Sequence, residues 1–295
     1  MKIYAPDYYS QFKCIANHCQ HSCCIGWEIE IDEDTLCKYK TVPGDFGKRL
    51  SESITTSGGT PVFLLGDNER CPFLNKNNLC DIILNIGEAN LCQICTDHPR
   101  FRNFYTDRTE IGIGLTCESA AMLILNREAK TELIPISEMK TTSQPTKEEQ
   151  DFFEIRTKLF EIAQNRNKTF ETRIQKLLSV SGIKLPHITA IQWSKELLSL
   201  EQLDDEWTEF LKYISTDGTK YSCDINDIQK EQLLVYFIFR HTAPDSIADG
   251  LRFALLATDI ILKLAPYSKS FSNLCRMFSS EIEYSKNNTD YLMNY

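Results

Sequence analysis

The sequence lacks an excess of basic residues, a long apolar run and an export segment. Its 32 Lys and Arg residues are outnumbered by 41 Asp and Glu residues, which gives a formal net charge of -9. A nucleic-acid-binding protein normally presents a basic face, so we expect no nucleic-acid partner. The most apolar late stretch, residues 251–265, is too short and too charged to span a bilayer. Because no basic region followed by an apolar run opens the chain, we expect a cytoplasmic protein without a membrane partner.

The sequence also lacks the glycine-rich turn of a dinucleotide-binding fold. That turn joins a strand to a helix and carries three glycines, with an acidic residue about twenty positions further on. Gly112-Ile113-Gly114 is the nearest match, but it lacks the third glycine and leads directly into Thr116-Cys117. The sequence therefore does not indicate a nucleotide-binding sheet of this kind.

Cysteine, by contrast, is abundant and unevenly distributed. Ten of the twelve cysteines lie between Cys14 and Cys117, and only Cys223 and Cys275 lie beyond them. In a secreted protein this density would predict disulfides, whereas in a reducing cytoplasm it predicts a metal site. We interpret Cys223, Cys275 and the isolated Cys37 as small buried apolar side chains.

The cysteines of the first part form three groups. The groups are Cys14-x4-Cys19-x3-Cys23-Cys24, then Cys71-x8-Cys80 followed by Cys92-x2-Cys95, and finally Cys117. Four thiolates can bind either one tetrahedral zinc ion or an iron–sulfur cube. Spacing alone favours the cluster, because only one pair has the C-x2-C form usual for structural zinc; zinc and unliganded cysteines stay as alternatives. His18, His21 and His98 are further possible ligands, with solvated loop histidines as the alternative.

The hydrophobic periodicity differs between the first and the second part of the chain. We predict a mainly α protein in which an irregular cysteine-rich module with minor β structure (1–130) and a connection (131–147) precede a helical domain (148–295). Short strands are expected at Trp27–Asp32 and Pro61–Leu65. A first helix is expected at 116–126, and a long helix is expected to begin at a capping box formed by Thr146 and Glu149. Further helices are expected at 169–182, 187–199, 203–215, 225–241 and 246–264.

Four segments taken together resemble the flagellin lysine N-methylase family, which shares a zinc- or iron-chelating cysteine domain with a wider group of proteins. They are CIANHCQHSCCIGWEIEID (14–32), CPFLNKNNLC (71–80), CTDHPR (95–100) and LTCESA (115–120), with YFIFRH (236–241) as a weaker match. The resemblance implies transfer of methyl groups from S-adenosylmethionine to lysine side chains of flagellin, assisted by a 4Fe-4S cluster.

The resemblance also implies a set of metal ligands. The positions that match the family pattern are Cys14, Cys19, Cys23, Cys24, Cys71, Cys80, Cys95 and Cys117. Eight cysteines exceed the four that one cluster needs, and Cys92 lies outside the pattern. The C-x3-C-x2-C signature of radical enzymes is incomplete, because its third cysteine position is Gly26.

A lysine methylase must also remove a proton from the lysine ammonium. It must bind two cations, the lysine and the sulfonium of S-adenosylmethionine, and carboxylates and aromatic faces are suited to surround them. The residues considered for this are Trp27, Glu28, Asp97, Glu110 and Glu118, with surface charges and a core tryptophan as the alternative reading. Two other functions stay open: a non-catalytic zinc- or iron-binding protein-interaction module, and a metal carrier or redox sensor.

Overall fold

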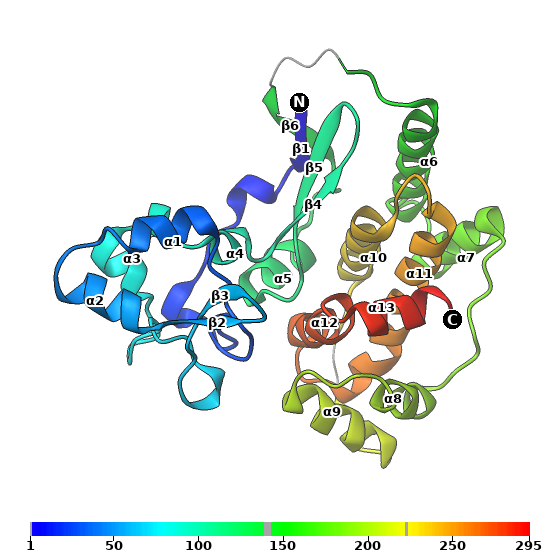
Figure 1. Cartoon of the computed structure of the whole chain (residues 1–295). Coiled ribbons are helices and arrows are strands. Elements are labelled where there is room, and N and C mark those ends of the chain that lie inside the picture. Colours follow the sequence, from blue (N-terminus) through cyan, green and yellow to red (C-terminus); the bar gives the residue numbers. More distant parts are fainter. Residues whose placement is uncertain (1, 139–142, 222–223) are drawn as a thin grey trace. The chain divides into compact units, whose positions relative to one another are not determined.

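A computed structural model describes residues 2–138, 143–221 and 224–295 of the chain (Figure 1). The prediction for Cys223 lies outside the described residues. Internal contacts divide the chain into a larger unit, residues 1–12 and 101–295, and a smaller unit, residues 13–100. The predicted boundary at residue 130 differs from this division, because residues 101–130 pack within the larger unit.

The smaller unit consists of short elements joined by irregular segments. Its helices are α1 (Glu33–Tyr39), α2 (Gly44–Glu52), α3 (Asp81–Ile86) and α4 (Gln93–Asp97), with single 3-10 turns at Ala16–His18, Asp67–Glu69 and Glu88–Asn90. Strands β2 (Ile54–Ser57) and β3 (Thr60–Phe63) form an antiparallel hairpin. The predicted strand at Pro61–Leu65 corresponds to β3, whereas β2 was not predicted.

The predicted strand at Trp27–Asp32 is wrong as a strand. Only one isolated bridge, between Glu30 and Val62 of β3, forms there. The alternation that suggested a strand is nevertheless real in burial, because Ile29 and Ile31 are buried and Glu30 is exposed. The alternating pattern therefore predicted correctly which side chains face the core, but it did not indicate a continuous β-strand.

The larger unit begins with a four-stranded sheet of order β4-β5-β1-β6. Its strands are β1 (Lys2–Pro6), β4 (Arg100–Phe104), β5 (Arg108–Ile113) and β6 (Leu133–Glu138). β1 pairs in parallel with β5 and antiparallel with β6, so the first residues of the chain join strands more than a hundred positions away. This pairing explains why residues 1–12 belong to the larger unit. β6 lies inside the segment predicted as a connection.

Helices make up the rest of the larger unit. They are α5 (Glu118–Leu125), α6 (Lys147–Ala163), α7 (Phe170–Ser181), α8 (Ala190–Leu198), α9 (Asp205–Ser215), α10 (Asp227–His241), α11 (Ile247–Leu264), α12 (Phe271–Phe278) and α13 (Lys286–Met293), with 3-10 turns at Tyr9–Gln11 and Ala265–Tyr267 and a π-helical turn, η6 (Ser279–Glu283). The predicted helices from 116 to 264 are confirmed, including the Thr146–Glu149 capping box. The two last helices and η6 were not predicted. The protein is therefore mainly α, as expected.

α10 is the centre of this unit. Every residue from Glu231 to Phe239 is buried, and the helix packs against α5, α6, α7 and α11. A helix that is covered on all sides has to satisfy its charged side chains internally. Glu231 does so by accepting from Arg166 Nη2 at 2.8 Å and from Arg173 Nη1 at 2.5 Å.

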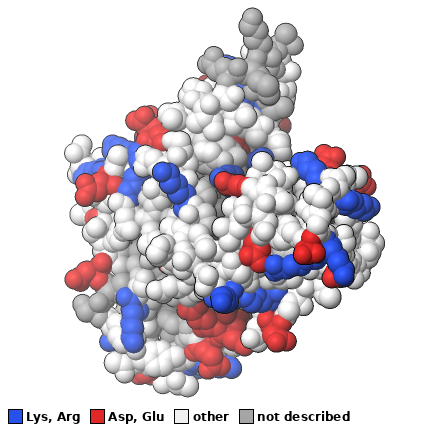
Figure 2. All heavy atoms as spheres, turned by 90° about the vertical axis from the view of Figure 1, so that its left-hand side faces the viewer, with Lys and Arg blue, Asp and Glu red and all other residues white. Residues whose placement is uncertain are grey.

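Charges of both signs are interspersed on the face drawn in Figure 2. Among the described residues, no helix has the length and apolar character needed to cross a membrane.

Candidate metal centre in the smaller unit

The cysteines of the predicted metal set are distributed unequally over the two units. Seven of the eight, Cys14, Cys19, Cys23, Cys24, Cys71, Cys80 and Cys95, belong to the smaller unit, and Cys117 belongs to the larger one. Cys14 and Cys23 are exposed and Cys19 is half-buried, all three on the irregular segment before α1.

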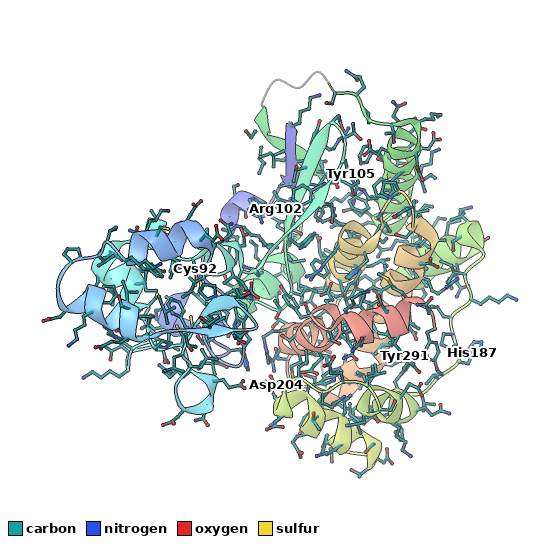
Figure 3. The ribbon with its side chains drawn as sticks, viewed as in Figure 1. Cys92, Arg102, Tyr105, His187, Asp204 and Tyr291 are labelled. Atoms are coloured by element: carbon teal, nitrogen blue, oxygen red, sulfur yellow. The ribbon has the colours of Figure 1, made fainter. Side chains whose placement is uncertain are left out.

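Five cysteines gather at the core of the smaller unit. Cys71 and Cys92 are buried among Phe63, Phe73 and other apolar side chains, and three half-buried cysteines pack against the same core: Cys24, Cys80 and Cys95. Figure 3 labels Cys92, and sulfur atoms drawn in yellow lie near it. The structure thus brings together four of the predicted residues and adds Cys92.

The loop between Cys71 and Cys80 is held by its own polar side chains. Arg70 donates to the carbonyl oxygen atoms of Leu74, at 3.2 Å, and Asn75, at 2.7 Å. The Asn75 side chain accepts from the backbone N–H of Leu79 at 3.1 Å, and Leu74 forms a bridge with Cys80. Because these bonds close the loop from inside, both cysteines are held at its base.

Backbone contacts link this loop to the first cysteine group. The backbone N–H of Cys71 donates to the carbonyl oxygen of Cys24 at 2.9 Å. On the other side, Asp81 accepts from Arg49 Nη1 at 2.7 Å, and Arg49 Nη2 donates to the carbonyl oxygen of Pro72 at 2.5 Å. These bonds therefore tie the Cys71–Cys80 loop both to the first cysteine group and to α2.

Cys92 and Cys95 form a thiol pair at the start of α4. Their Sγ atoms lie 3.3 Å apart, well beyond the length of about 2.05 Å of a disulfide bond. The hydrogen bond between the two thiols lowers the pKa of Cys92, and the same bond, together with burial, raises the pKa of Cys95. Charges on Cys24 and Cys71 raise the pKa of Cys95 further. The two thiols together therefore lose one proton readily and retain the second.

The other thiols of the group are also perturbed. Burial raises the pKa of Cys71 to about 12 and raises that of Cys80, and a charge on Cys24 raises both. Cys24 itself is the exception: a hydrogen bond from Cys23 lowers its pKa to about 7 against the opposing effect of burial. Several thiolates at this point therefore destabilise one another, and a bound cation would offset that cost.

The donor chemistry of these side chains fits a thiolate-binding metal, but their arrangement is not that of a finished site. Within the described ranges, no three Cys, His, Asp or Glu side chains are placed so that they could hold one metal ion. Two thiolates on one tetrahedral ion, each about 2.3 Å from it, lie about 3.8 Å apart. The 3.3 Å between Cys92 and Cys95 is close to that separation, so small side-chain rotations would bring these two thiolates to the distance they have on one ion.

The histidines of the smaller unit differ in their surroundings. His98 is half-buried near Trp27, with ring centroids 6.1 Å apart, and burial lowers its pKa to about 4. Its imidazole is therefore neutral near pH 7, as a metal ligand requires. His18 is exposed and His21 is half-buried, both on the segment before α1.

Two of the residues singled out in the sequence, Glu110 and Gly112, have structural roles instead. Glu110 on β5 is buried and accepts from both terminal nitrogen atoms of Arg156 on α6, at 2.6 and 2.7 Å. A carboxylate held in this way is not available to accept a proton from lysine. A side chain at Gly112 would meet the rings of Phe101 and Phe239 within 3 Å, so packing accounts for this glycine.

The sequence signal for Cys92 was its spacing from Cys95, which is that of a metal knuckle. Cys92 lies outside the family pattern, yet its side chain is completely buried beside Cys95. Trp27, for which the sequence favours a core position over a site position, is half-buried and donates to the carbonyl oxygen of Cys23 at 2.5 Å.

Comparison with known proteins gives partial similarities. The chain is 26% identical over 129 residues to a lysine-N-methylase of Salmonella typhimurium and, to the same extent, to that of Salmonella choleraesuis; each match covers 41% of this chain and 32% of the relative. It is 25% identical over 134 residues to the flagellar biosynthetic protein FliU of Salmonella muenchen, covering 41% of this chain and 75% of that protein. No family model and no solved structure matches. The chain thus spans about a third of the length of the two methylases, and its similarity to all three relatives is limited to about two fifths of its own length.

Proposed function

We propose that this protein is a lysine N-methyltransferase that transfers methyl groups from S-adenosylmethionine to flagellin with the help of a 4Fe-4S cluster bound in the smaller unit. The observation that carries the metal site is the gathering of Cys24, Cys71, Cys80, Cys92 and Cys95 at one core. The likeness to lysine N-methylases supports the reaction, and the flagellar name of a third relative supports the substrate.

The thiolates of this group would hold the cluster. When bound, a cluster with an open iron supplies a site for the amino and carboxyl groups of S-adenosylmethionine, or an electron for its sulfonium. The exposed Cys14 and Cys23 and the half-buried Cys19 are additional ligands that the segment before α1 could bring in. Cys117 as a ligand stays a prediction.

The reaction needs a lysine amine without its extra proton, because a lysine ammonium, with a pKa of about 10.4, is not a nucleophile. In the smaller unit, the carboxylates considered for this step are Glu28, which is exposed, and Asp97, which is half-buried. Asp97 accepts from Gln93 Nε2 at 2.7 Å and lies two residues after Cys95. We propose these two side chains as proton acceptors.

One observation favours zinc as the second candidate metal. Thiolates on different iron atoms of a cube lie further apart than thiolates on one ion, and the 3.3 Å between Cys92 and Cys95 is nearer to the single-ion value. A zinc site would support the alternative of a non-catalytic protein-interaction module.

Metal analysis of protein purified without oxygen tests the proposal first. We expect iron and acid-labile sulfide in comparable amounts, a brown colour and little zinc. In Cys71→Ser the metal should be lost, because this buried thiol has cysteine neighbours. Cys37, which the sequence predicted as a buried apolar side chain, is exposed, so that prediction is wrong. Cys37→Ser is therefore the matched control: it removes an exposed cysteine of the same unit, and its metal content should equal that of the native chain.

Incubation of the native protein with flagellin and S-adenosylmethionine, followed by mass measurement, tests the activity. Added methyl groups on flagellin lysines are expected. Iron without methyl transfer would instead indicate a metal carrier or redox sensor, and zinc without methyl transfer would indicate the interaction module.

A further inference from the structure

A buried carboxylate in the larger unit collects three donors from α10. Glu283 accepts from Arg240 Nε at 3.1 Å, from His241 Nε2 at 2.6 Å and from the Tyr236 hydroxyl at 2.9 Å. Burial alone would raise the pKa of Glu283, but the charge of Arg240 and the bond from His241 lower it. Burial lowers the pKa of His241, so its ring is neutral and we assign its proton to Nε2, facing the carboxylate.

The hydroxyl of Tyr236 has no hydrogen-bonding capacity left. Its proton is donated to Glu283, and its oxygen accepts from Arg240 Nη1 at 2.8 Å and from the backbone N–H of Leu115 at 3.2 Å. A phenol has one proton and two lone pairs, and all three are used. The ring is 2% exposed. This hydroxyl is therefore poorly suited to exchange protons with a substrate, and well suited to hold the backbone at Leu115.

A second bond ties the next residue to the same place. The hydroxyl oxygen atoms of Thr116 and Ser280 lie 2.6 Å apart. Ser280 and Glu283 both belong to the π-helical turn η6 (Ser279–Glu283). Single π-helical turns are rare and frequently occur at functional sites. The turn η6 thus bonds directly to Thr116 and is linked to Leu115 through the Tyr236 hydroxyl, two consecutive residues of the segment between β5 and α5.

The segment held in this way ends at Cys117. Cys117 is half-buried and is the residue that precedes the first turn of α5. Its backbone N–H donates to the carbonyl oxygen of Gly114 at 3.3 Å, so residues 114–117 form a closed turn. The fixed backbone at Leu115 and Thr116 therefore sets the direction in which the Cys117 thiol leaves the turn.

We propose that Tyr236, Ser280 and Glu283 are positioning residues that fix residues 114–117 and thereby place the Cys117 thiol. The importance of this thiol for activity rests on the function proposed above together with the separate sequence prediction that Cys117 is a metal ligand. Two sequence segments that stood far apart, LTCESA and YFIFRH, are joined by this contact. The polar residues of the second segment, Tyr236, Arg240 and His241, are those that meet Glu283.

Amide hydrogen exchange in Tyr236→Phe tests the contact without using activity. Loss of the hydroxyl leaves the Leu115 N–H without its acceptor, which corresponds to about a tenfold faster exchange at residues 115–117. Ser280→Ala should raise exchange at the same segment less, because the hydroxyl of Tyr236 remains. Tyr267→Phe, which changes another buried tyrosine of the larger unit, should leave the segment unchanged.

Alkylation of Cys117 by iodoacetamide in reduced, metal-free protein tests whether these residues set the position of the thiol. We expect its rate, followed on the peptide that contains it, to change several-fold in Tyr236→Phe and in Ser280→Ala, while the rate at Cys275 stays the same.

Unchanged exchange at 115–117, or an increase spread evenly over the larger unit, would overturn the proposal, and so would an unchanged alkylation rate. If Tyr236→Phe does not fold, Ser280→Ala decides by the same two measurements. Absence of metal and of methyl transfer in the native protein would remove the proposed function and leave these two readouts as they are.

Discussion

Glu281 is a buried carboxyl group whose oxygen atoms are unequally satisfied. Oε2 accepts from the backbone N–H of Leu203 at 2.9 Å, and Oε1 has no hydrogen-bond partner among the described residues. Burial raises its pKa from 4.5 to about 7. A raised pKa in the folded state means that its contribution to stability is complete below about pH 4.5 and is lost as the pH rises through about 7.

Glu281→Gln should therefore remove a pH dependence. Near pH 5 the variant and the native chain should have similar free energies of unfolding, because both side chains are neutral. Near pH 8 the variant should be more stable by on the order of 2 kcal/mol, after allowance for solvent screening. Urea unfolding at both pH values measures this, and an equal difference at the two pH values would contradict it.

The ion pair of Glu110 and Arg156 gives a second prediction at this scale. Arg156→Met leaves a buried carboxylate without its partner, so we expect a loss of about 3 to 5 kcal/mol in the free energy of unfolding. The double variant Glu110→Met/Arg156→Met should recover much of that loss, since no unpaired charge remains. Equal destabilisation of the single and the double variant would show that the pair contributes through packing alone.

At the scale of the element, the start of α6 joins a cap to a tertiary contact. The Thr146 hydroxyl accepts from the backbone N–H of Glu149 at 3.1 Å. The Glu149 carboxylate accepts from the backbone N–H of Thr146 and from that of Thr106, the latter at 2.8 Å. Thr146→Ala should cost about 1 kcal/mol, whereas Thr146→Ser should cost little. Glu149→Ala should cost more than Thr146→Ala, because it also releases Thr106. Chemical unfolding of the three variants measures the order, and an equal cost for Thr146→Ala and Glu149→Ala would contradict it.

The same element shows what the sequence could predict. The helices from α6 to α11 carry local signals, such as the capping box of α6 and Gly182, which ends α7 with a φ of +71°. β1 carries no such signal, because its partners β5 and β6 are distant in sequence and the strand has five residues. Local periodicity therefore specified helices well and long-range strand pairing poorly.

The candidate site shows the same limit. Spacing predicted that cysteines of several groups meet at one metal, and Cys24, Cys71, Cys80 and Cys95 all belong to or border the core of the smaller unit. That they bind one metal stays a prediction. Spacing could not show that Cys92 is buried with them, because its burial follows from tertiary packing of the start of α4. The network around Glu283 was also missed, since it joins a turn near the end of the chain to α10 and to the backbone of Leu115.

At the scale of the whole molecule, the two units differ in how they are stabilised. The larger unit has an extensive apolar core that includes most of α10 and α11, whereas the core of the smaller unit is built from few residues, and cysteines form part of it. A small, irregular unit of this kind gains more from a bound metal than a large helical one does. Under the proposed function, removal of the metal should therefore act mainly on residues 13–100.

Hydrogen exchange of the full chain with and without a chelator, in the absence of oxygen, measures this difference. We expect faster exchange across α1 to α4 and the β2–β3 hairpin after metal removal, with little change in α10 and α11. Cys37→Ser should respond as the native chain does, because its thiol lies outside the buried group. Cys71→Ser should resemble the metal-free native chain even without chelator. Equal exchange with and without chelator throughout residues 13–100 would mean that the gathered thiols stabilise the smaller unit by packing alone, and not by holding a metal.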